Sequence, residues 1–367
     1  MSIKLDLIPV SEWGFQSSQR PIVIAGPCSA ETEEQVMETA RQVAAQGVTI
    51  FRAGIWKPRT RPNSFEGVGA EGLVWLQKVR QETGMKVGTE VANAKHVYEA
   101  IKYGVDLLWI GARTTVNPFA VQEIADALQG VDIPILVKNP VSPDLSLWMG
   151  ALERLNKVGI KKLGAIHRGF TVYDTTPYRN PPQWQLAIDL MQKLPDLPIF
   201  ADPSHMAGNR EFLFSLSQKA LDLHYTGLMI ETHITPEKAW SDASQQVTPE
   251  GLRSILDRLV VRHRRPEDPK VMESLEDLRA QIDKLDDILM DNICRRMDIA
   301  DQIGMYKREN NMTILQSGRW EEITQHRRED GLKRGLSEAF LDRYLKAVHQ
   351  ESINRQSKIM NEDLTSS

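Results

Sequence analysis

Eight short apolar runs recur along the first two thirds of the chain, and this repetition constrains the fold more than any other feature. Each run is rich in Ile and Val and nearly continuous in hydrophobicity, as in strands buried on both faces of a parallel sheet. The runs cover Pro21–Ser29, Thr49–Gly54, Lys86–Val91, Leu107–Ala112, Pro134–Asn139, Leu163–Gly169, Pro198–His205 and Gly227–His233. Amphipathic stretches with helical spacing lie between them, for example Glu33–Gln46, Leu73–Glu82, Ala94–Tyr103 and Phe119–Leu128. We therefore predict an α/β fold, a (β/α)8 TIM barrel of about 240 residues.

The length and charge of the chain limit what else it can be. Its 367 residues exceed one ordinary small domain and suggest about two. With 45 Lys and Arg against 49 Asp and Glu, no strongly basic field attracts nucleic acid or a membrane surface. The sequence contains no run of 18 apolar residues, so we expect no membrane span. Cys28 and Cys294 are too few for a disulfide framework, and the amino terminus lacks a signal-peptide pattern, so we expect a cytoplasmic protein.

The pattern changes after Arg262–Lys270, a charged segment with two prolines that suits an exposed linker. Apolar residues then alternate at spacings of three and four, which predicts a long helix ending at about Glu309. At 1.5 Å per residue this helix is roughly 50 Å long, too long to bury its apolar stripe within so small a segment, so we expect it to pair with another chain. The stripe comprises Leu275, Leu278, Ile282, Leu285, Leu289, Ile299, Ile303 and Tyr306.

Two shorter helices are predicted after the long one. The first covers about Gly318–Glu329, and the second runs from Ser337, a typical N-cap residue, to Met360. The predicted organisation is a barrel over residues 1–262, a linker over 263–271, a separate all-α domain of three helices over 272–360, and a disordered tail over 361–367.

Polar residues follow the predicted strands, and active sites of such barrels lie at the carboxyl ends of the strands. Cys28, His205, Glu231 and Asp242 are candidate metal ligands, and this mixed set suits Mn, Fe, Co or Zn without selecting among them. The alternative for Cys28 is a small buried hydrophobic residue.

Six cations would face the same mouth of the barrel: Arg52, Lys57, Arg59, Arg113, Lys138 and Arg168. Taken singly, each could be a solvated loop charge. Together they would repel one another unless a ligand with several negative charges binds there, and Arg side chains suit phosphate and carboxylate oxygens. The residues therefore predict a metal-dependent enzyme that acts on phosphorylated acids or sugars.

Several motifs at the strand ends carry a family resemblance. They are GPCS at Gly26–Ser29, RAGIWKPRT at Arg52–Thr60, IGART at Ile110–Thr114, HRG at His167–Gly169, DPSH at Asp202–His205 and the ET-H…SDA motif at Glu231–Ala243. Together they resemble 3-deoxy-D-arabino-heptulosonate 7-phosphate (DAHP) synthase of the type I beta branch. The resemblance implies condensation of phosphoenolpyruvate with erythrose 4-phosphate to DAHP and phosphate, the entry step of aromatic amino-acid synthesis.

The same resemblance implies a role for each matching residue. Cys28, His205, Glu231 and Asp242 would hold a divalent ion, Mn²⁺ before Co, Fe, Zn or Cd. Arg52, Lys57, Arg113, Lys138, Arg168 and His205 would bind phosphoenolpyruvate, and Lys57, Pro58, Arg59 and Thr60 would receive erythrose 4-phosphate. Asp202 would lie beside the sugar hydroxyls. We expect Lys57 to handle a proton, with its pKa lowered by the surrounding cations.

A sister family, 3-deoxy-manno-octulosonate 8-phosphate synthase, shares the barrel and the phosphoenolpyruvate site. Its sugar-site motif is closer to K-x-N-R-S-S, so the KPRT sequence of Lys57–Thr60 favours the four-carbon sugar. The Lys138–Pro140 sequence, KNP, departs from the Lys-Arg-Gly ending of the type I beta branch, which leaves the contacts of that loop open.

The long helix carries two polar residues, Asn292 and Arg296, on its apolar seam. A buried unpaired charge is costly, so Arg296 either snorkels to the edge of the stripe or binds an anion. The stretch Leu275–Lys307 resembles the all-helical (AroQ-type) chorismate mutase family, and the resemblance extends over Glu273–Met360. It implies that chorismate is bound by Arg279, Arg296, Lys307, Arg319 and Gln356.

In that family an intertwined homodimer forms, and the partner chain contributes the first arginine. The implied reaction rearranges chorismate to prephenate without a covalent catalyst, with Lys307 and Gln356 contacting the breaking ether oxygen. Gln316 and Trp320 stand where the bacterial fusions with prephenate dehydratase have Asp and Glu.

Three functions remain open on the sequence. The first is a bifunctional enzyme with one activity in each domain. The second is a synthase whose helical domain is a non-catalytic regulatory and dimerising module that binds prephenate or chorismate and restrains the barrel. The third is a non-catalytic sugar-phosphate-binding protein.

Overall fold

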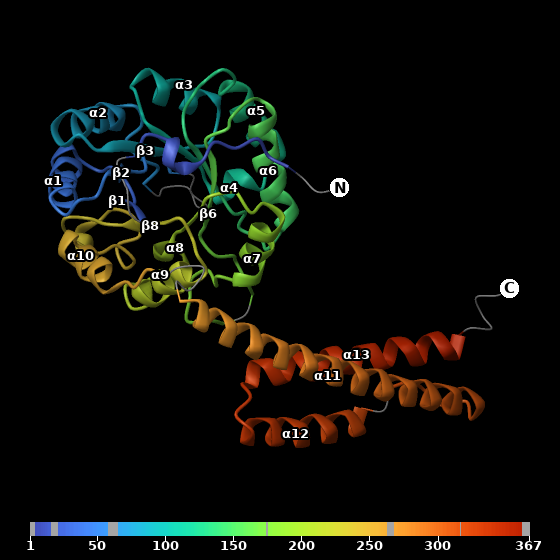
Figure 1. The fold of residues 1–367 in the computed structure, drawn as a ribbon. Coiled ribbons are helices and arrows are strands. Elements are labelled where there is room, and N and C mark those ends of the chain that lie inside the picture. The colour runs from blue at the N-terminus through green and yellow to red at the C-terminus, as the bar shows by residue number, and fades with distance from the viewer. Residues whose placement is uncertain are drawn as a thin grey trace. The chain divides into compact units, whose positions relative to one another are not determined.

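The computed structural model describes residues 4–15, 21–57, 65–173, 175–262, 268–315 and 317–361, apart from the side chains of 317–323. The chain forms two compact units, Met1–Arg264 and Arg265–Ser367 (Figure 1). The first unit is a barrel of strands surrounded by helices, and the secondary structure of the described residues in the second is helical. The predicted fold class is therefore confirmed.

Eight parallel strands close the barrel, and each pairs with its two neighbours in chain order. The last strand pairs with the first over five residues, from Ile22 opposite Gly227 to Gly26 opposite Glu231. The strands are β1 (Ile22–Gly26), β2 (Ile50–Arg52), β3 (Lys86–Val91), β4 (Leu107–Ile110), β5 (Ile135–Lys138), β6 (Leu163–His167), β7 (Ile199–Ala201) and β8 (Gly227–Glu231). Each lies within one of the eight apolar runs, because the flanking polar residues of those runs belong to the loops.

Helices follow the strands and form the outer layer in Figure 1. They are α1 (Glu33–Ala44), α2 (Glu71–Thr83), α3 (Ala94–Lys102), α4 (Ala112–Thr115), α5 (Pro118–Ala127), α6 (Leu145–Lys157), α7 (Trp184–Lys193), α8 (Pro203–Ala207), α9 (Leu213–Asp222) and α10 (Pro249–Arg258). Several begin at the polar residue that their sequence predicts. The side chains of Thr32, Asn93, Asp144 and Thr248 each accept a hydrogen bond from a backbone N–H in the first turn.

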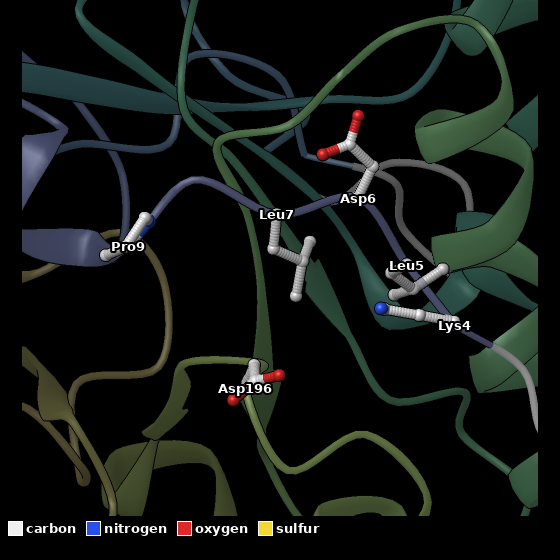
Figure 2. A pocket seen from close by; sticks show the side chains of 6 residues that line it. All are labelled: Lys4, Leu5, Asp6, Leu7, Pro9 and Asp196. Atoms are coloured by element: carbon white, nitrogen blue, oxygen red, sulfur yellow. The ribbon is translucent and has the colours of Figure 1, made fainter.

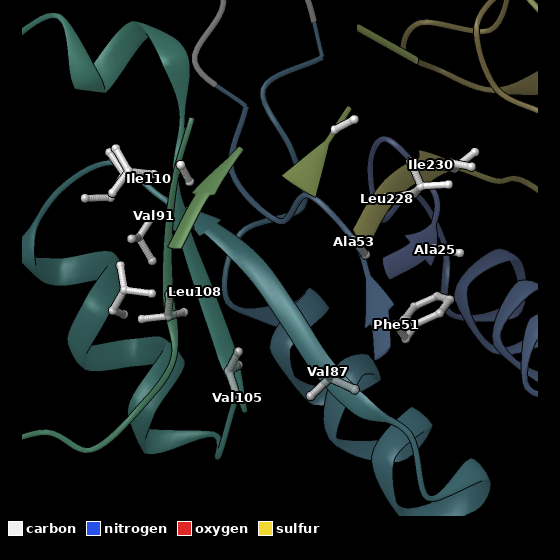
Figure 3. Close-up of a cluster of buried hydrophobic side chains, with 14 of the residues drawn as sticks. Ala25, Phe51, Ala53, Val87, Val91, Val105, Leu108, Ile110, Leu228 and Ile230 are labelled. Carbon is white, nitrogen blue, oxygen red and sulfur yellow. The ribbon is translucent and has the colours of Figure 1, made fainter. Parts of the chain in front are cut away.

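Alternate residues of the strands fill two cores. Side chains that point outward pack against the helices, among them Phe51, Leu108 and Ile110, which Figure 3 shows. The side chains that fill the barrel interior form a second cluster, which includes Ile24, Trp109 and Phe200. Because both faces of every strand are buried, the strands read as continuous apolar runs in the sequence.

The amino-terminal segment covers the end of the barrel where the strands begin. Trp13 follows the short 3-10 helix η1 (Val10–Glu12) and packs into the interior cluster. The backbone N–H of Ile8 donates to the carbonyl of Lys161, just before β6. A groove of about 650 Å³ lies beside this segment and includes Asp196, which precedes β7 (Figure 2). It is therefore at the opposite end from the polar residues that follow the strands.

The second unit contains α11 (Pro269–Glu309), α12 (Ser317–Lys333) and α13 (Glu338–Asn361). The linker that we predicted over 263–271 is therefore helical from Pro269 onward, and its residues 263–267 lie outside the described part of the chain. The helix α11 packs on α13 through Met297, Ala300, Gly304 and Lys307, and a Cβ on Gly304 would lie 3.1 Å from the Cα of Gln356. Close approach of the two helices explains the glycine.

The apolar stripe predicted on α11 lies elsewhere on that helix. Its members, from Leu275 to Tyr306, are exposed in the single chain. The face that packs on α13 carries small residues and a lysine instead, so the apolar spacing identified a surface that the chain's own helices leave open.

Candidate active sites

The four candidate metal ligands come from three strand ends and one loop, and they lie in two touching pairs. Cys28 follows β1, and its Sγ lies 3.3 Å from Oδ2 of Asp242. His205 lies in α8, and its Nε2 is 3.7 Å from Oε1 of Glu231, the last residue of β8. Cys28 and Glu231 are fully buried. Burial, Glu231 and Asp242 together raise the pKa of the Cys28 thiol to about 12, although Lys57 lowers it.

The donor chemistry of these residues fits a divalent ion, but the side chains are not gathered around a single point. Among the described residues, no three His, Cys, Asp or Glu side chains already stand close enough to hold an ion. The ammonium of Lys57 lies 2.8 Å from Cys28 Sγ and uses a lone pair that a metal would need. Oε1 of Glu231, in contrast, is buried and accepts no hydrogen bond from any described residue. This oxygen has an ion pair with Arg52 but no hydrogen bond, so a metal ion could still coordinate it.

Two of the predicted cations are paired inside the barrel, which corrects the expectation that all six lack anionic partners. Arg52 Nη2 lies 3.2 Å from Oε1 of Glu231, and Lys138 Nζ donates to Oδ2 of Asp202 at 2.8 Å. All four groups are buried. Burial raises the pKa of Asp202, but His205 and Lys138 lower it by more, so its pKa lies well below the ordinary value. These pairs form because strand-end acids and bases converge at the same edge of the barrel.

Arg168 and Arg113 remain candidates for binding an anionic ligand. Arg168 follows β6 and is buried, and its guanidinium donates to the carbonyl of Gly169. Burial above all, together with the charges of Arg179 and Arg113, lowers its pKa to about 10, although Asp202 opposes the decrease. Arg113, in α4, is exposed and makes no ion pair with a described residue. An anionic ligand between these guanidinium groups would relieve their repulsion.

Lys57 differs from the prediction in its protonation. Burial lowers its pKa, but Cys28 and Glu231 raise it by more, so the pKa lies above its ordinary value. The expected decrease was wrong because the nearest charged groups are acidic side chains rather than other cations. Besides Cys28 Sγ, the ammonium donates to the carbonyl of Cys28 at 3.2 Å.

The rest of the predicted sugar-binding stretch, Pro58, Arg59 and Thr60, lies outside the described residues. Asp202 lies at the N-cap of α8 and accepts from the backbone N–H of His205. Its other oxygen is 2.8 Å from His205 Nδ1, so Nε2 of that ring faces Glu231.

Sequence reasoning missed several polar residues that support the site. Asn139 is buried beside Lys138, donates to the carbonyl of Gly169 and accepts from the backbone N–H of Arg168. It thus joins the ends of β5 and β6. Arg179 and Gln245 contact the carboxylates of Asp242 and Glu231. Asn139 could have been noticed as a polar residue directly after a strand, whereas the other two carry no local signal.

In the helical unit, three predicted residues come together between α11 and α13. Nη1 of Arg296 donates to Oγ of Ser352 at 2.5 Å, and Nζ of Lys307 donates to Oε1 of Gln356 at 3.1 Å. Burial lowers the pKa of Lys307. Ser352 was not predicted, although it precedes Gln356 by one helical turn and so faces the same way. The arrangement offers two cations and two polar groups to an anion.

The other two predicted residues are not brought to this place by the single chain. Arg279 is exposed and pairs with Glu276 on its own helix. It precedes Arg296 by 17 residues of α11, which is roughly 25 Å of helix. Arg319 lies on α12, and its side chain is outside the described part of the structure, as is Gln316.

The fold thus consists of a (β/α)8 barrel with a candidate anion site at its strand ends, followed by a helical domain with a second candidate anion site. Residues 15–262 match the family model described as the DAHP synthetase I family, and residues 278–357 match that of chorismate mutase type II. The chain belongs to the DAHP synthetase I family. Its two matched regions make it a bifunctional enzyme of aromatic biosynthesis, with a DAHP synthase domain and a chorismate mutase domain.

Individual relatives agree with the family for the barrel. Phospho-2-dehydro-3-deoxyheptonate aldolase of Thermotoga maritima is 32% identical over 237 residues, which cover 65% of this chain and 68% of the relative. A crystal structure of the Thermotoga maritima DAHP synthase matches with a TM-score of 0.59 at 31% identity, over 65% of this chain and 67% of that one. A 2-dehydro-3-deoxyphosphooctonate aldolase of Legionella pneumophila is 26% identical and covers 67% of this chain and 93% of the relative.

Proposed function

We propose that the barrel site binds phosphoenolpyruvate through Arg113 and Arg168 and accepts erythrose 4-phosphate at the adjoining Lys57–Thr60 segment. The observation that carries the proposal is the buried guanidinium of Arg168, whose pKa is lowered in part by the charge of Arg113, at the barrel edge that also holds the buried Cys28, Asp202 and Glu231. The cations would hold the phosphate and carboxylate of one substrate. Arg52 and Lys138, whose positions are fixed by ion pairs with buried acids, would contact the same substrate from the barrel interior.

We further propose that Cys28, His205, Glu231 and Asp242 hold a divalent metal ion, Mn²⁺ before Co, Fe, Zn or Cd. When bound, such an ion supplies Lewis-acid polarisation of an aldehyde oxygen. Support comes from the mixed donor set, which suits transition metals, and from the buried Oε1 of Glu231, which accepts no hydrogen bond. The ammonium of Lys57, which donates to Cys28, would turn toward the sugar substrate as the thiolate becomes a ligand.

Lys57 is the residue we propose for proton transfer in the barrel. Its ammonium is charged at neutral pH because acidic neighbours raise its pKa, so it would act as an acid. The proton would go to the aldehyde oxygen as the enol carbon of phosphoenolpyruvate attacks. Asp202 would orient the sugar hydroxyls, and His205 would contact phosphoenolpyruvate. Water then adds at the neighbouring carbon and phosphate leaves.

For the helical domain we propose that Arg296, Lys307 and Gln356 bind chorismate in its compact form. The cations would hold the carboxylates, while Lys307 and Gln356 would contact the breaking ether oxygen. Their contact with each other, at 3.1 Å, orients the lysine toward that position. Arg319 would contribute from α12.

The distance between Arg279 and Arg296 supports a homodimer or a higher homo-oligomer. We propose that Arg279 of the partner subunit completes each mutase site, with the exposed stripe of α11 buried between the two chains. Prephenate bound in this domain would then exert feedback control on the barrel, a coupling that the two-site arrangement allows. Among the described residues no helix is long and apolar enough to cross a membrane. The scarcity of cysteine favours a cytoplasmic location.

Phosphate release from phosphoenolpyruvate tests the barrel proposal. We expect release only when erythrose 4-phosphate is also present, loss of release with a chelator, and recovery on addition of Mn²⁺. Arabinose 5-phosphate should replace the four-carbon sugar poorly. Release that survives complete metal removal would contradict the metal site, and a preference for the five-carbon sugar would contradict the assigned substrate.

A further inference from the structure

Two side chains that the mechanism does not use lie behind the carboxylates of the barrel site. They are Arg179, in the loop before α7, and Gln245, in the loop after β8. We infer that Arg179 and Gln245 are positioning residues: each holds one oxygen of a carboxylate, so that the other oxygen faces the metal site. This inference rests on the metal dependence proposed above and assigns the groups that prepare two of its ligands.

These two residues and the two carboxylates form one connected chain of hydrogen bonds. Nε2 of Gln245 donates to Oε2 of Glu231 at 2.6 Å, and Nη1 of Arg179 donates to Oδ1 of Asp242 at 2.8 Å. The same guanidinium nitrogen donates to Oε1 of Gln245 at 3.0 Å. Gln245 is fully buried, and both ends of its amide are used. Its orientation is therefore fixed by Arg179, and it in turn fixes Glu231.

The other oxygen of each carboxylate faces a further candidate metal ligand, His205 for Glu231 and Cys28 for Asp242. Oε1 of Glu231 is buried and lies 3.2 Å from Nη2 of Arg52 and 3.7 Å from Nε2 of His205, but neither contact has hydrogen-bond geometry. Oδ2 of Asp242 lies 3.3 Å from Sγ of Cys28. A buried carboxylate oxygen normally accepts a hydrogen bond, so Oε1 of Glu231, which has only its ion pair with Arg52, is the oxygen available to a metal ion.

The backbone around Asp242 is built to hold this arrangement. Asp242 has a φ of 48°, a left-handed conformation that Asp tolerates better than most residues. On either side the loop is tied to the β1 loop: Oγ of Ser241 lies 2.5 Å from Oγ of Ser29, and Oε1 of Gln246 accepts from the backbone N–H of Cys28 at 2.9 Å. Asp242 is thus held at a fixed position relative to Cys28.

Space for the Arg179 side chain depends on a glycine. A Cβ on Gly208 would lie 2.5 Å from the Cβ of Arg179. The backbone N–H of Arg179 also donates to the carbonyl of Ala207, at the end of the helix that carries His205. The loop before α7 is therefore fitted against the ligand-bearing elements, and Arg179 reaches Asp242 from a defined place.

Outer hydrogen-bond partners of metal-ligating side chains typically contribute 10- to 100-fold in metal affinity. The test is Mn²⁺ titration of the full-length, metal-free protein by calorimetry, with the variants Gln245→Glu and Arg179→Met. Gln245→Glu keeps the size of the side chain and its contact with Arg179 but cannot donate to Glu231. We expect Mn²⁺ to bind about 10- to 100-fold more weakly to each variant, with the thermal midpoint of the metal-free protein retained.

A similar pair elsewhere in the barrel provides the matched control. Nη1 of Arg154 on α6 donates to Oε1 of Gln122 on α5 at 2.9 Å, away from the strand ends. The variants Gln122→Glu and Arg154→Met should bind Mn²⁺ with wild-type affinity. With Co²⁺ in place of Mn²⁺, thiolate-to-metal absorption should reach wild-type intensity at saturation in the Gln245 and Arg179 variants, because Cys28 is intact.

The outcomes separate this inference from the proposed function. If the wild-type protein binds no divalent ion, the metal part of the proposed function fails. If it binds Mn²⁺ and both site variants bind it equally well, only the inference is overturned. Should Arg179→Met fail to fold, Arg179→Lys replaces it: a single ammonium cannot hold Asp242 and Gln245 together, so affinity should still fall, and unchanged affinity would again overturn the inference.

Discussion

His167, at the end of β6, shows how one buried side chain supports the site and makes stability depend on pH. Its Nε2 lies 2.6 Å from the carbonyl of Pro182, so that nitrogen carries the proton, and Nδ1 accepts from the hydroxyl of Tyr225 at 2.8 Å. Burial lowers its pKa to about 4. The ring is therefore neutral at neutral pH and holds the strand end that precedes Arg168.

The folded-state pKa of His167 lies below the unfolded value of about 6.5, so the unfolded chain binds more protons between these values. Stability should therefore be greatest above pH 6.5 and decrease as the pH falls toward 4, by on the order of 3 kcal/mol from this group. Urea unfolding of the wild type and of His167→Asn over this range checks the prediction. The variant should be less stable at pH 7 but lose less on acidification; parallel curves would contradict it.

Gly111, which precedes Arg113, is predicted to be intolerant of a side chain. A Cβ there would lie 2.2 Å from Oε1 of Glu90, whose other oxygen accepts from Nε1 of Trp109. Because Glu90 is held, Gly111→Ala should lower the free energy of unfolding by about 1–3 kcal/mol and reduce condensation. Gly150→Ala is the control, since Gly150 lies in α6 with open space around it, and alanine should stabilise that helix. Equal stability of the two variants in urea would refute the prediction.

Individual residues also mark the limit of sequence reasoning. Cys28, Glu231 and Arg168 could be identified because each follows an apolar strand, and a parallel barrel gathers strand ends at one edge. Arg179 could not, because it lies 63 residues from its partner Asp242 and on an irregular loop. The sign of the Lys57 pKa shift was missed for the same reason, since it depends on which groups stand nearest in space.

At the scale of elements, the spacing of apolar residues predicted which strands and helices form, but not which helix faces contact each other. The buried strands and their order followed from continuous apolar runs, and the structure trims only the polar ends of those runs. For α11 the spacing of Leu and Ile predicted the helix correctly but not the face that meets α13, because that contact uses Ala300 and Gly304. Small residues allow close approach yet carry little hydrophobic signal.

The exposed stripe of α11 leads to a prediction about association. Ile282 and Leu285 are exposed in the single chain, so a charge there should cost little unless a second chain covers them. We expect the wild type to sediment as at least a dimer of the 41.6 kDa chain. Ile282→Glu should dissociate it and reduce mutase turnover at least tenfold, because the partner's arginine is lost.

Phe119→Glu provides the control for this prediction. Phe119 is 89% exposed on α5 of the barrel, so its replacement should change neither the sedimentation nor the mutase rate. A wild-type monomer with full mutase activity would contradict the shared site.

On the scale of the whole molecule, the net charge of −4 hides two local cationic sites, one at the strand ends and one between α11 and α13. Each uses residues from a single compact unit, apart from the proposed contribution of a partner chain. The chemistry of the two reactions is independent as well, since one forms a carbon–carbon bond between phosphorylated substrates and the other rearranges a dianion. The two active sites should therefore be separable by single substitutions.

Assaying both activities in two variants of the full-length chain tests this claim most directly. Arg296→Gln should reduce chorismate turnover by about 100-fold or more and leave DAHP formation within about twofold of wild type. Arg113→Met should reduce DAHP formation at least tenfold and leave chorismate turnover unchanged, because Arg113 has no ion-pair partner among the described residues whose loss could unfold the chain. A substitution that reduced both activities by the same factor, or neither, would contradict an enzyme with two separate active sites.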